Sequence, residues 1–183
     1  MKKTLIIVGS IVLLILVVFM YYKSTYDKAV KLDEGVMTAW SDVGADYQRR
    51  ADLIPGLIET VKGAAENEKD ILTAVTNARA GIVGAKTPEE MELAGKKINA
   101  AINLAFEAYP QIRSTENFGV FQAQLEGTEN RINVSRKKYN ESVKLYNSHV
   151  RSLIPSMLIG GKFPTKEPFK ESAGSEVAPE VKF

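Results

Sequence analysis

Residues 5–22 read LIIVGSIVLLILVVFMYY, an 18-residue run without a charged side chain. As a helix this run would be about 27 Å long, which nearly matches the hydrocarbon core of a bilayer. A cleaved secretory signal peptide is the alternative, but its apolar part is usually shorter and is followed by small residues. Here Tyr21, Tyr22 and Lys23 follow, and such side chains are typical of a membrane interface. The segment therefore predicts one transmembrane helix over residues 5–22, after a short tail over residues 1–4.

Charge and composition exclude several classes of protein. The chain has 183 residues and a net charge of +2, which gives no electrostatic reason to expect a nucleic-acid partner. It contains no cysteine, so disulfides, thiol nucleophiles and cysteine-based metal sites are excluded. This length is enough for one domain with appendages. The stability of the fold must therefore come from helix packing.

Apolar residues three or four apart predict that the membrane helix continues to a turn near Leu53–Pro55, where proline disfavours helical geometry. A second helix is expected from Leu57 to Ile82. The next helix has a strong start signal in Thr87-Pro88-Glu89-Glu90, because it combines a capping threonine, a proline at the first helical position and a glutamate three residues after the cap.

The third helix is expected to stop at Tyr109-Pro110, and a fourth to run from about Thr115 to Leu153 until Pro155 ends it. Each helix then has one apolar seam that should face the core. The seam positions are Ala29, Leu32, Val36, Trp40, Val43, Tyr47, Ala51 and Ile54; Leu57, Ile58, Val61, Ala65, Leu72, Val75, Ala78 and Ile82; Met91, Ala94, Ile98, Ala101, Ile102, Ala105 and Phe106; and Phe118, Phe121, Leu125, Thr128, Ile132, Ser135, Tyr139, Ser142, Val143, Tyr146, Val150 and Leu153.

Short connections make successive helices antiparallel, so residues 23–154 should form an antiparallel four-helix bundle. Residues 155–183 form a tail rich in proline and glycine that no regular element should accept. Its phenylalanines indicate that part of it lies against the bundle, and full disorder of the tail is the alternative. Four passes return the chain to the membrane side. Met157–Ile159 should therefore emerge near Tyr22 and Lys23, against the bundle base, a neighbouring subunit or the lipid interface.

The sequence offers no catalytic, cofactor-binding or metal-binding constellation. The only histidine, His149, lacks the Glu-x-x-His partners of a di-metal bundle, and near a helix end an imidazole is simply favourable. The cluster of Arg49, Arg50 and Asp52 could bind an anion, but surface ion pairing is the simpler interpretation. We therefore expect no enzyme, no cofactor and no metal.

Several blocks spread over nearly the whole chain form a specific pattern. They are Ala39-Trp40-Ser41-Asp42-Val43, Gln48-Arg49-Arg50-Ala51-Asp52-Leu53-Ile54-Pro55, Glu59-Thr60-Val61-Lys62-Gly63, Glu107-Ala108-Tyr109-Pro110, Thr128-Glu129-Asn130-Arg131-Ile132, Tyr139-Asn140 and Tyr146-Asn147. Together these blocks resemble the LemA family. The resemblance implies one membrane helix, a long antiparallel helical bundle and no established enzymatic activity. It also implies links to membrane organisation, through a branch connected with magnetosome membranes, and to membrane metalloproteases, through neighbouring genes.

These features together favour a non-enzymatic, membrane-anchored scaffold or adaptor that acts by self-association, as a homo-oligomer with coiled-coil-like helices, and by partner binding. The bilayer is one expected partner, and a membrane protease or another membrane protein is a candidate. A membrane-shaping oligomer is the alternative function. We expect a single-pass protein of the bacterial cell membrane. Its orientation stays open, because Lys2 and Lys3 precede the apolar run and Lys23, Lys28 and Lys31 follow it. The short charged N-terminal tail resists translocation, which favours a bundle outside the cytoplasm.

Overall fold

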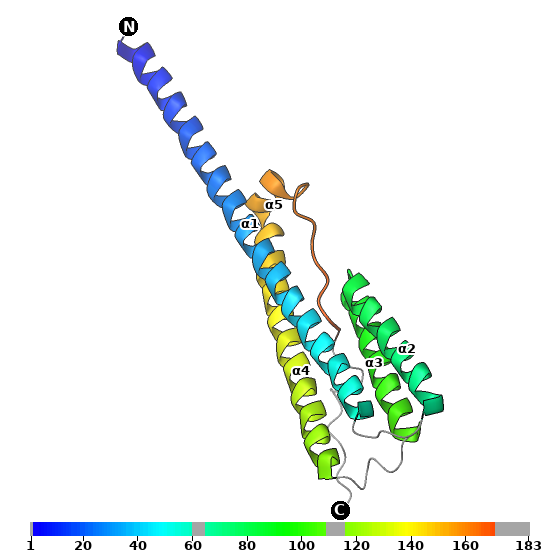
Figure 1. Cartoon of the computed structure of the whole chain (residues 1–183). Helices are drawn as coiled ribbons and strands as arrows, with labels where there is room; N and C mark the ends of the chain where they lie inside the picture. The colour runs from blue at the N-terminus through cyan, green and yellow to red at the C-terminus, as the bar shows by residue number, and fades with distance from the viewer. Residues whose placement is uncertain (1, 60–64, 109–115, 171–183) are drawn as a thin grey trace, which may run out of the picture. The chain divides into compact units, whose positions relative to one another are not determined.

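The computed structural model describes residues 2–59, 65–108 and 116–170, and this part of the chain is all-α (Figure 1). Its helices are α1 (Lys2–Glu59), α2 (Ala65–Gly84), α3 (Pro88–Ala108), α4 (Glu116–Val150) and α5 (Leu153–Ile159). These ranges contain no strand. The predicted fold class, a long apolar N-terminal helix followed by a helical bundle, is confirmed.

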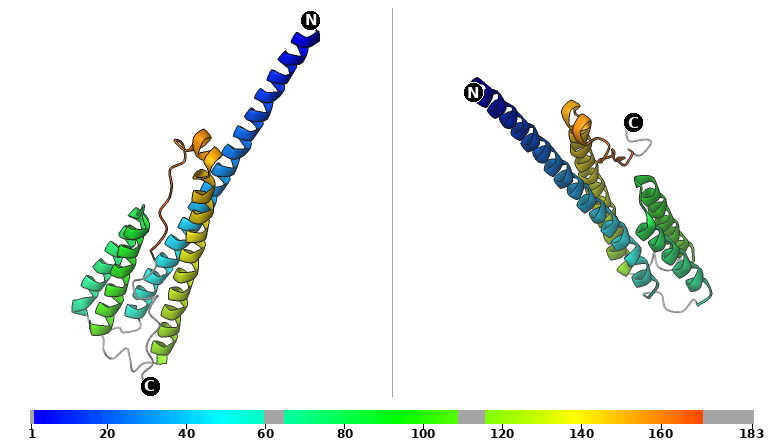
Figure 2. Two further views of the ribbon diagram at one scale, coloured as in Figure 1. Left: turned by 180° about the vertical axis from the view of Figure 1, so that it is seen from behind. Right: turned by 90° about the horizontal axis from the view of Figure 1, so that it is seen from above.

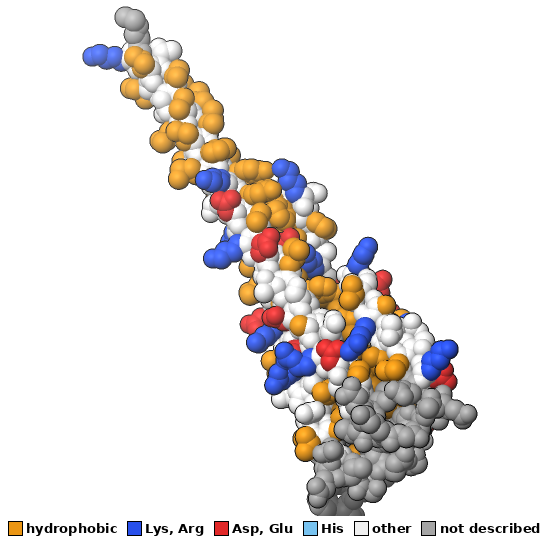
Figure 3. Space-filling view, in the orientation of Figure 1, with side chains coloured by type: hydrophobic (Ala, Val, Ile, Leu, Met, Phe, Trp, Pro, Cys, Tyr) orange, Lys and Arg blue, Asp and Glu red, His pale blue; other side chains and the backbone are white. Residues whose placement is uncertain are grey.

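The N-terminal third of α1 exposes every side chain from Lys2 to Tyr21. Figure 3 shows apolar side chains covering this part of the helix. Among the described residues, α1 is the one helix long and apolar enough to cross a membrane, and its apolar window is entirely unburied. Apolar surface of this extent is stable in lipid rather than in water, so α1 suggests a single-pass membrane anchor.

The chain folds into two compact units, and α1 and α4 each run through both. The first unit comprises the residues up to Thr38 together with Glu141–Lys166. It contains the apolar part of α1, the end of α4 and all of α5. Its buried side chains are those of Thr25, Ala29, Val36, Val143, Tyr146, Val150, Pro155 and Ile159.

The second unit comprises Ala39–Asn140 and the residues from Glu167 onward. Within it, Trp40 lies against Tyr139 and Arg50 pairs with Glu129, so the numbers on α4 fall as those on α1 rise. The two helices are therefore antiparallel there. Helices α2 and α3 form an antiparallel pair joined by residues 85–87 (Figure 2).

Small residues set the close approaches in the second unit. A Cβ atom at Gly95 of α3 would clash with the ring of Tyr47 of α1, so only glycine fits there. A Cβ at Gly81 would lie 3.4 Å from the Ala94 Cβ, which is ordinary van der Waals contact between α2 and α3. The predicted seams of the third helix and of most of the fourth are confirmed, because their residues form the core. The buried residues of this unit are Ala39, Val43, Tyr47, Ala51, Ile54, Ile71, Val75, Ala78, Ile82, Ala85, Pro88, Met91, Ala94, Gly95, Ile98, Ala101, Ile102, Ala105, Phe121, Thr128, Ile132, Ser135, Tyr139 and Phe169.

The predicted start of the third helix is confirmed at the level of single hydrogen bonds. The Glu90 N–H donates to Thr87 Oγ1 at 3.2 Å, and Glu90 Oε2 accepts from the N–H groups of Thr87 at 3.3 Å and Lys86 at 2.7 Å. This reciprocal arrangement satisfies backbone donors that the first turn of a helix leaves unpaired.

The predicted turn at Leu53–Pro55 is wrong, because α1 continues through Pro55 to Glu59. Proline removes one helical hydrogen bond, but Ala51 and Ile54 are completely buried. Burial of this seam holds the backbone helical where local propensity alone would end it. The connection between α1 and α2 therefore falls at residues 60–64, outside the described residues, as do the side chains of the predicted seam positions from Leu57 to Ala65.

The second predicted seam is partly wrong. Ile71 is completely buried, whereas Leu72 is 38% exposed. Val75, Ala78 and Ile82 are buried as predicted, and Ile71 lies four residues before Val75 on the same face.

The predicted stop of the third helix agrees with its last helical residue, Ala108, while Tyr109, Pro110 and Thr115 lie outside the described residues.

The predicted end of the fourth helix is also wrong, since α4 ends at Val150 and Pro155 lies inside α5. In a continuous helix the Pro155 ring would clash with the carbonyl of Arg151. The chain avoids this clash by leaving the helix at Ser152, which is extended at φ −65° and ψ 150°. Pro155 then falls in the first turn of α5, where no backbone donor is needed. As a result Leu153, predicted to be buried, is 77% exposed.

Candidate functional site

The most specific polar site in the described residues is a pair of clamps on α4 that hold residues 160–170, here called the strap. The strap follows α5 after a turn in which the Lys162 N–H donates to the Ile159 carbonyl at 2.9 Å. Its residues 164–170 have no regular secondary structure. Such a segment must find hydrogen-bond partners for its backbone outside itself.

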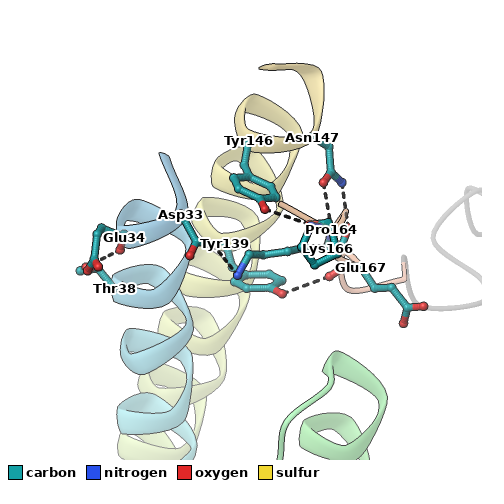
Figure 4. A network of polar contacts seen from close by, with 9 residues as sticks. All are labelled: Asp33, Glu34, Thr38, Tyr139, Tyr146, Asn147, Pro164, Lys166 and Glu167. Carbon is teal, nitrogen blue, oxygen red and sulfur yellow. Dashed lines mark hydrogen bonds and ion pairs between the residues drawn. The ribbon is translucent and has the colours of Figure 1, made fainter. Parts of the chain in front are cut away.

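The first clamp lies in the first unit (Figure 4). The Asn147 Nδ2 donates to the Lys166 carbonyl at 2.8 Å, and Asn147 Oδ1 accepts from the Lys166 N–H at 2.9 Å. The neighbouring Tyr146 hydroxyl donates to the Pro164 carbonyl at 2.9 Å. An amide side chain offers one donor and one acceptor side by side, so Asn147 satisfies both backbone groups of Lys166 as a neighbouring strand would.

The second clamp repeats this pattern within the second unit. The Asn140 Nδ2 donates to the Phe169 carbonyl at 3.0 Å, and Asn140 Oδ1 accepts from the Phe169 N–H at 2.8 Å. The Tyr139 hydroxyl donates to the Glu167 carbonyl at 3.1 Å (Figure 4).

The two clamps share one sequence pattern. The Tyr-Asn pairs are seven residues apart in the sequence of α4, and the strap residues that they hold are three apart.

Side chains of the strap add specificity to these backbone contacts. In the first unit, Lys166 Nζ lies 2.6 Å from Asp33 Oδ1 and 5.4 Å from the centre of the Tyr146 ring. In the second unit the Phe169 ring is buried against Trp40 and Tyr139, with centroid distances of 5.9 and 5.2 Å.

The tyrosines of the clamps act as neutral donors. Burial raises the pKa of the Tyr139 hydroxyl above its ordinary value, and the Glu167 carboxylate raises it further. Burial also raises the pKa of Tyr146, with a further contribution from Asp33. Both hydroxyls therefore keep the proton that they donate to the strap.

The predicted charge cluster at the end of α1 is not one site. Arg50 pairs with Glu129, Asp52 pairs with Arg79, and Arg49 lies 3.7 Å from Asp46. The structure thus favours the ion-pairing interpretation over the anion-binding one.

A pocket of about 420 Å³ in the second unit is lined by Tyr47, Arg50, Glu92, Glu129 and Arg136, together with other residues. Its arginines are already paired with carboxylates, Arg50 with Glu129 and Arg136 with Glu92. Burial raises the pKa of Tyr47; the two arginines oppose this rise and the two glutamates reinforce it.

His149 has a structural contact in the first unit. Its Nε2 lies 3.0 Å from the Thr25 carbonyl oxygen. A carbonyl oxygen only accepts, so this nitrogen must carry the proton. The histidine thus ties α4 to α1.

The clamps were not predicted as a site, although Tyr139-Asn140 and Tyr146-Asn147 were noted as part of the resemblance. The usable signal was the seven-residue repeat, which places each tyrosine on the core seam and each asparagine beside it.

The predicted contact of the tail with the bundle is confirmed at two places. The ring centroids of Phe163 and Tyr26 are 5.3 Å apart, and Phe169 is buried. Phe183 lies outside the described residues.

The structure thus defines a class of protein, an all-α chain with one apolar N-terminal helix and a C-terminal strap bound to its bundle. The family model described as LemA family matches residues 39–183, so the chain belongs to the LemA family. The match covers the second unit, α5 and both clamps, and it begins after the apolar run. The chain is also similar to the protein LemA of Metamycoplasma hominis, at 21% identity over 143 residues, which cover 76% of this chain and 65% of that relative. The match thus spans slightly less than two thirds of the relative's length.

Proposed function

We propose that this LemA-family protein is a membrane-anchored, non-enzymatic scaffold or adaptor that acts by self-association and partner binding. The observation that carries the proposal is that its polar side chains bind other segments of the same chain. Asn140, Asn147, Tyr139 and Tyr146 hold backbone, and arginines of the second unit pair with carboxylates of other helices. Side chains held in such contacts recognise one segment of the chain and make the bundle rigid.

Exposed apolar side chains supply surfaces for association. Val83 of α2 is 79% exposed and Val120 of α4 is 60% exposed. Large apolar groups exposed on bundle helices are candidate contacts for a second copy or for another membrane protein, and a membrane protease is one candidate partner.

The protein is proposed to sit in the bacterial cell membrane by a single pass of α1, with the bundle outside the cytoplasm. Fusion of a cytoplasm-only reporter and an export-only reporter at Phe183 tests this orientation. Activity of the export-only reporter alone supports it, and activity of the cytoplasm-only reporter alone reverses it.

A membrane-shaping oligomer is the second candidate function. It is favoured by α5, whose exposed apolar side chains belong to the same unit as the apolar part of α1. Lipid contact by such groups in many neighbouring copies could impose curvature on a bilayer.

Negative-stain imaging of the full chain in detergent, followed by reconstitution into liposomes, tests both functions. Rings, filaments or defined clusters support self-association, and tubulated liposomes support membrane shaping. Isolated single copies that bring no other polypeptide through purification would contradict the scaffold proposal.

A further inference from the structure

Helix α5 has two chemically similar faces in different surroundings. Pro155 and Ile159 are buried, and Ile159 is only 1% exposed. Leu153, Ile154 and Met157 are 77%, 50% and 79% exposed. At 100° per residue these three form one stripe on the side opposite the buried pair. A seven-residue helix thus presents almost only apolar side chains outward.

The contacts of α5 and its flanks place it where the apolar part of α1 ends. Lys162 Nζ lies 3.4 Å from the Tyr22 hydroxyl, and the Phe163 ring lies 5.3 Å from the Tyr26 ring. Figures 1 and 2 show α5 at the end of α4, and α5 belongs to the same unit as the apolar part of α1. The sequence-based expectation that Met157–Ile159 emerge near Tyr22 agrees with the contact of Lys162, three residues after Ile159, with Tyr22.

Charge distinguishes a lipid from a protein as the occupant of the exposed stripe. Residues 142–166 contain no aspartate or glutamate, and their basic side chains are Lys144, Arg151, Lys162 and Lys166. A basic, acid-free segment around an apolar stripe is typical of a surface that contacts anionic lipid headgroups. Three aliphatic side chains also fall well short of the about 800 Å² per partner that a stable protein interface buries.

We propose that α5 is a second membrane contact: its Leu153, Ile154 and Met157 side chains insert into the headgroup region of the bilayer that α1 spans, and Arg151 and Lys162 face anionic lipid. The α5 contact fixes the first unit to the membrane surface at two points, α1 and α5. This inference rests on the proposed membrane anchoring by α1 and is independent of the scaffold role.

The chain contains no cysteine, so single cysteines can carry a spin label without removing native ones. We would label Met157→Cys in the full chain in vesicles of phosphatidylcholine with phosphatidylglycerol, and measure collisions with oxygen and with a water-soluble nickel chelate. Leu145→Cys is the matched control, because Leu145 is 56% exposed in the same unit but lies more than two helical turns from α5. The label at residue 157 should show an oxygen-to-nickel collision ratio severalfold above that at residue 145.

Equal ratios at residues 157 and 145 would overturn the proposal. Protection of residue 157 from both reagents, with spectral broadening relieved by adding unlabelled chain, would also overturn it, because a second copy would then cover the stripe. A label at Val12→Cys distinguishes failure of the α1 anchor from failure of the α5 contact. If residue 12 is outside lipid, the anchor itself fails; if residue 12 is in lipid and residue 157 is not, only this inference fails.

The charge component has its own test. Arg151→Glu should lower the oxygen-to-nickel ratio at residue 157 in the anionic vesicles. Lys144→Glu is the matched control, because Lys144 is also exposed in the same unit, and it should leave the ratio unchanged. An equal effect of the two variants would contradict recognition of anionic lipid at α5.

Discussion

Phe169 lies against Trp40, with ring centroids 5.9 Å apart and planes 19° from parallel. The contact joins the strap to α1 in the second unit. Arg136 completes the surroundings, with its guanidinium 4.8 Å from the centre of the Phe169 ring. Trp40 is the only tryptophan in the chain, so its fluorescence reports on the docking of the strap.

Phe169→Ala should undock the strap from the second unit. The ring is 3% exposed, and loss of a buried phenylalanine side chain costs about 3–5 kcal/mol. Trp40 emission should shift to longer wavelength as the indole gains water. Phe169→Leu is the control, because it keeps most of the apolar volume and should shift the emission less. An unchanged emission spectrum in the alanine variant would show that Phe169 does not cover Trp40.

Asn147→Ala should weaken the first clamp by about 1–2 kcal/mol, because it leaves both backbone groups of Lys166 without their partner. Hydrogen exchange of the Lys166 amide is the direct measurement, and it should become faster. Ser148→Ala is the matched control, since Ser148 is exposed on the same turn of α4. Equal protection of Lys166 in both variants would argue against the clamp.

Alkaline pH should release the strap. The pKa values of Tyr139 and Tyr146 are raised in the folded state, so their contribution to stability is fully present below the unfolded tyrosine value of about 10. That contribution is lost as the pH rises through the folded values, because a phenolate cannot donate to a carbonyl. Ultraviolet titration should show three tyrosines ionising later than in the denatured chain, because burial also raises the pKa of Tyr47. The double variant Tyr139→Phe and Tyr146→Phe should leave only the Tyr47 part of the late step, and a late step of unchanged size would contradict the assignment.

Gly95→Ala should destabilise the second unit by about 1–3 kcal/mol, because the new methyl group overlaps the ring of Tyr47. Gly119→Ala is the control: nothing lies within 4 Å of a Cβ there, and alanine in an exposed helix is favoured by about 1 kcal/mol. Thermal unfolding monitored by circular dichroism separates the two. A neutral or stabilising effect at residue 95 would mean that α3 and α1 do not approach closely.

Local signals in the sequence predicted local structure well. The hydrogen bonds of Thr87 and Glu90 join groups within one turn, and the spacing of Val43, Tyr47 and Ile54 marks one face of a helix whatever it packs against. The exposed apolar part of α1 was similarly predictable from the absence of charge over residues 5–22.

The errors have non-local causes. Pro55 stays helical because the seam around it is buried, and Pro155 fits in the first turn of α5 because the chain leaves the helical conformation at Ser152. The clamps join residues 19 and 29 positions apart along the chain. The periodicity of α4 alone does not predict which segment Asn140 and Asn147 bind.

The most direct test of the account is the mass of the particle that the full chain forms when it is extracted from membranes in native lipid nanodiscs. The account predicts assemblies that contain several copies of the 20.2 kDa chain, alone or with another membrane protein. Val83→Glu and Val120→Glu, which place charges on exposed apolar positions of α2 and α4, should reduce the number of copies. A single copy per particle at every concentration, with no other polypeptide and no change in either variant, would contradict the scaffold account.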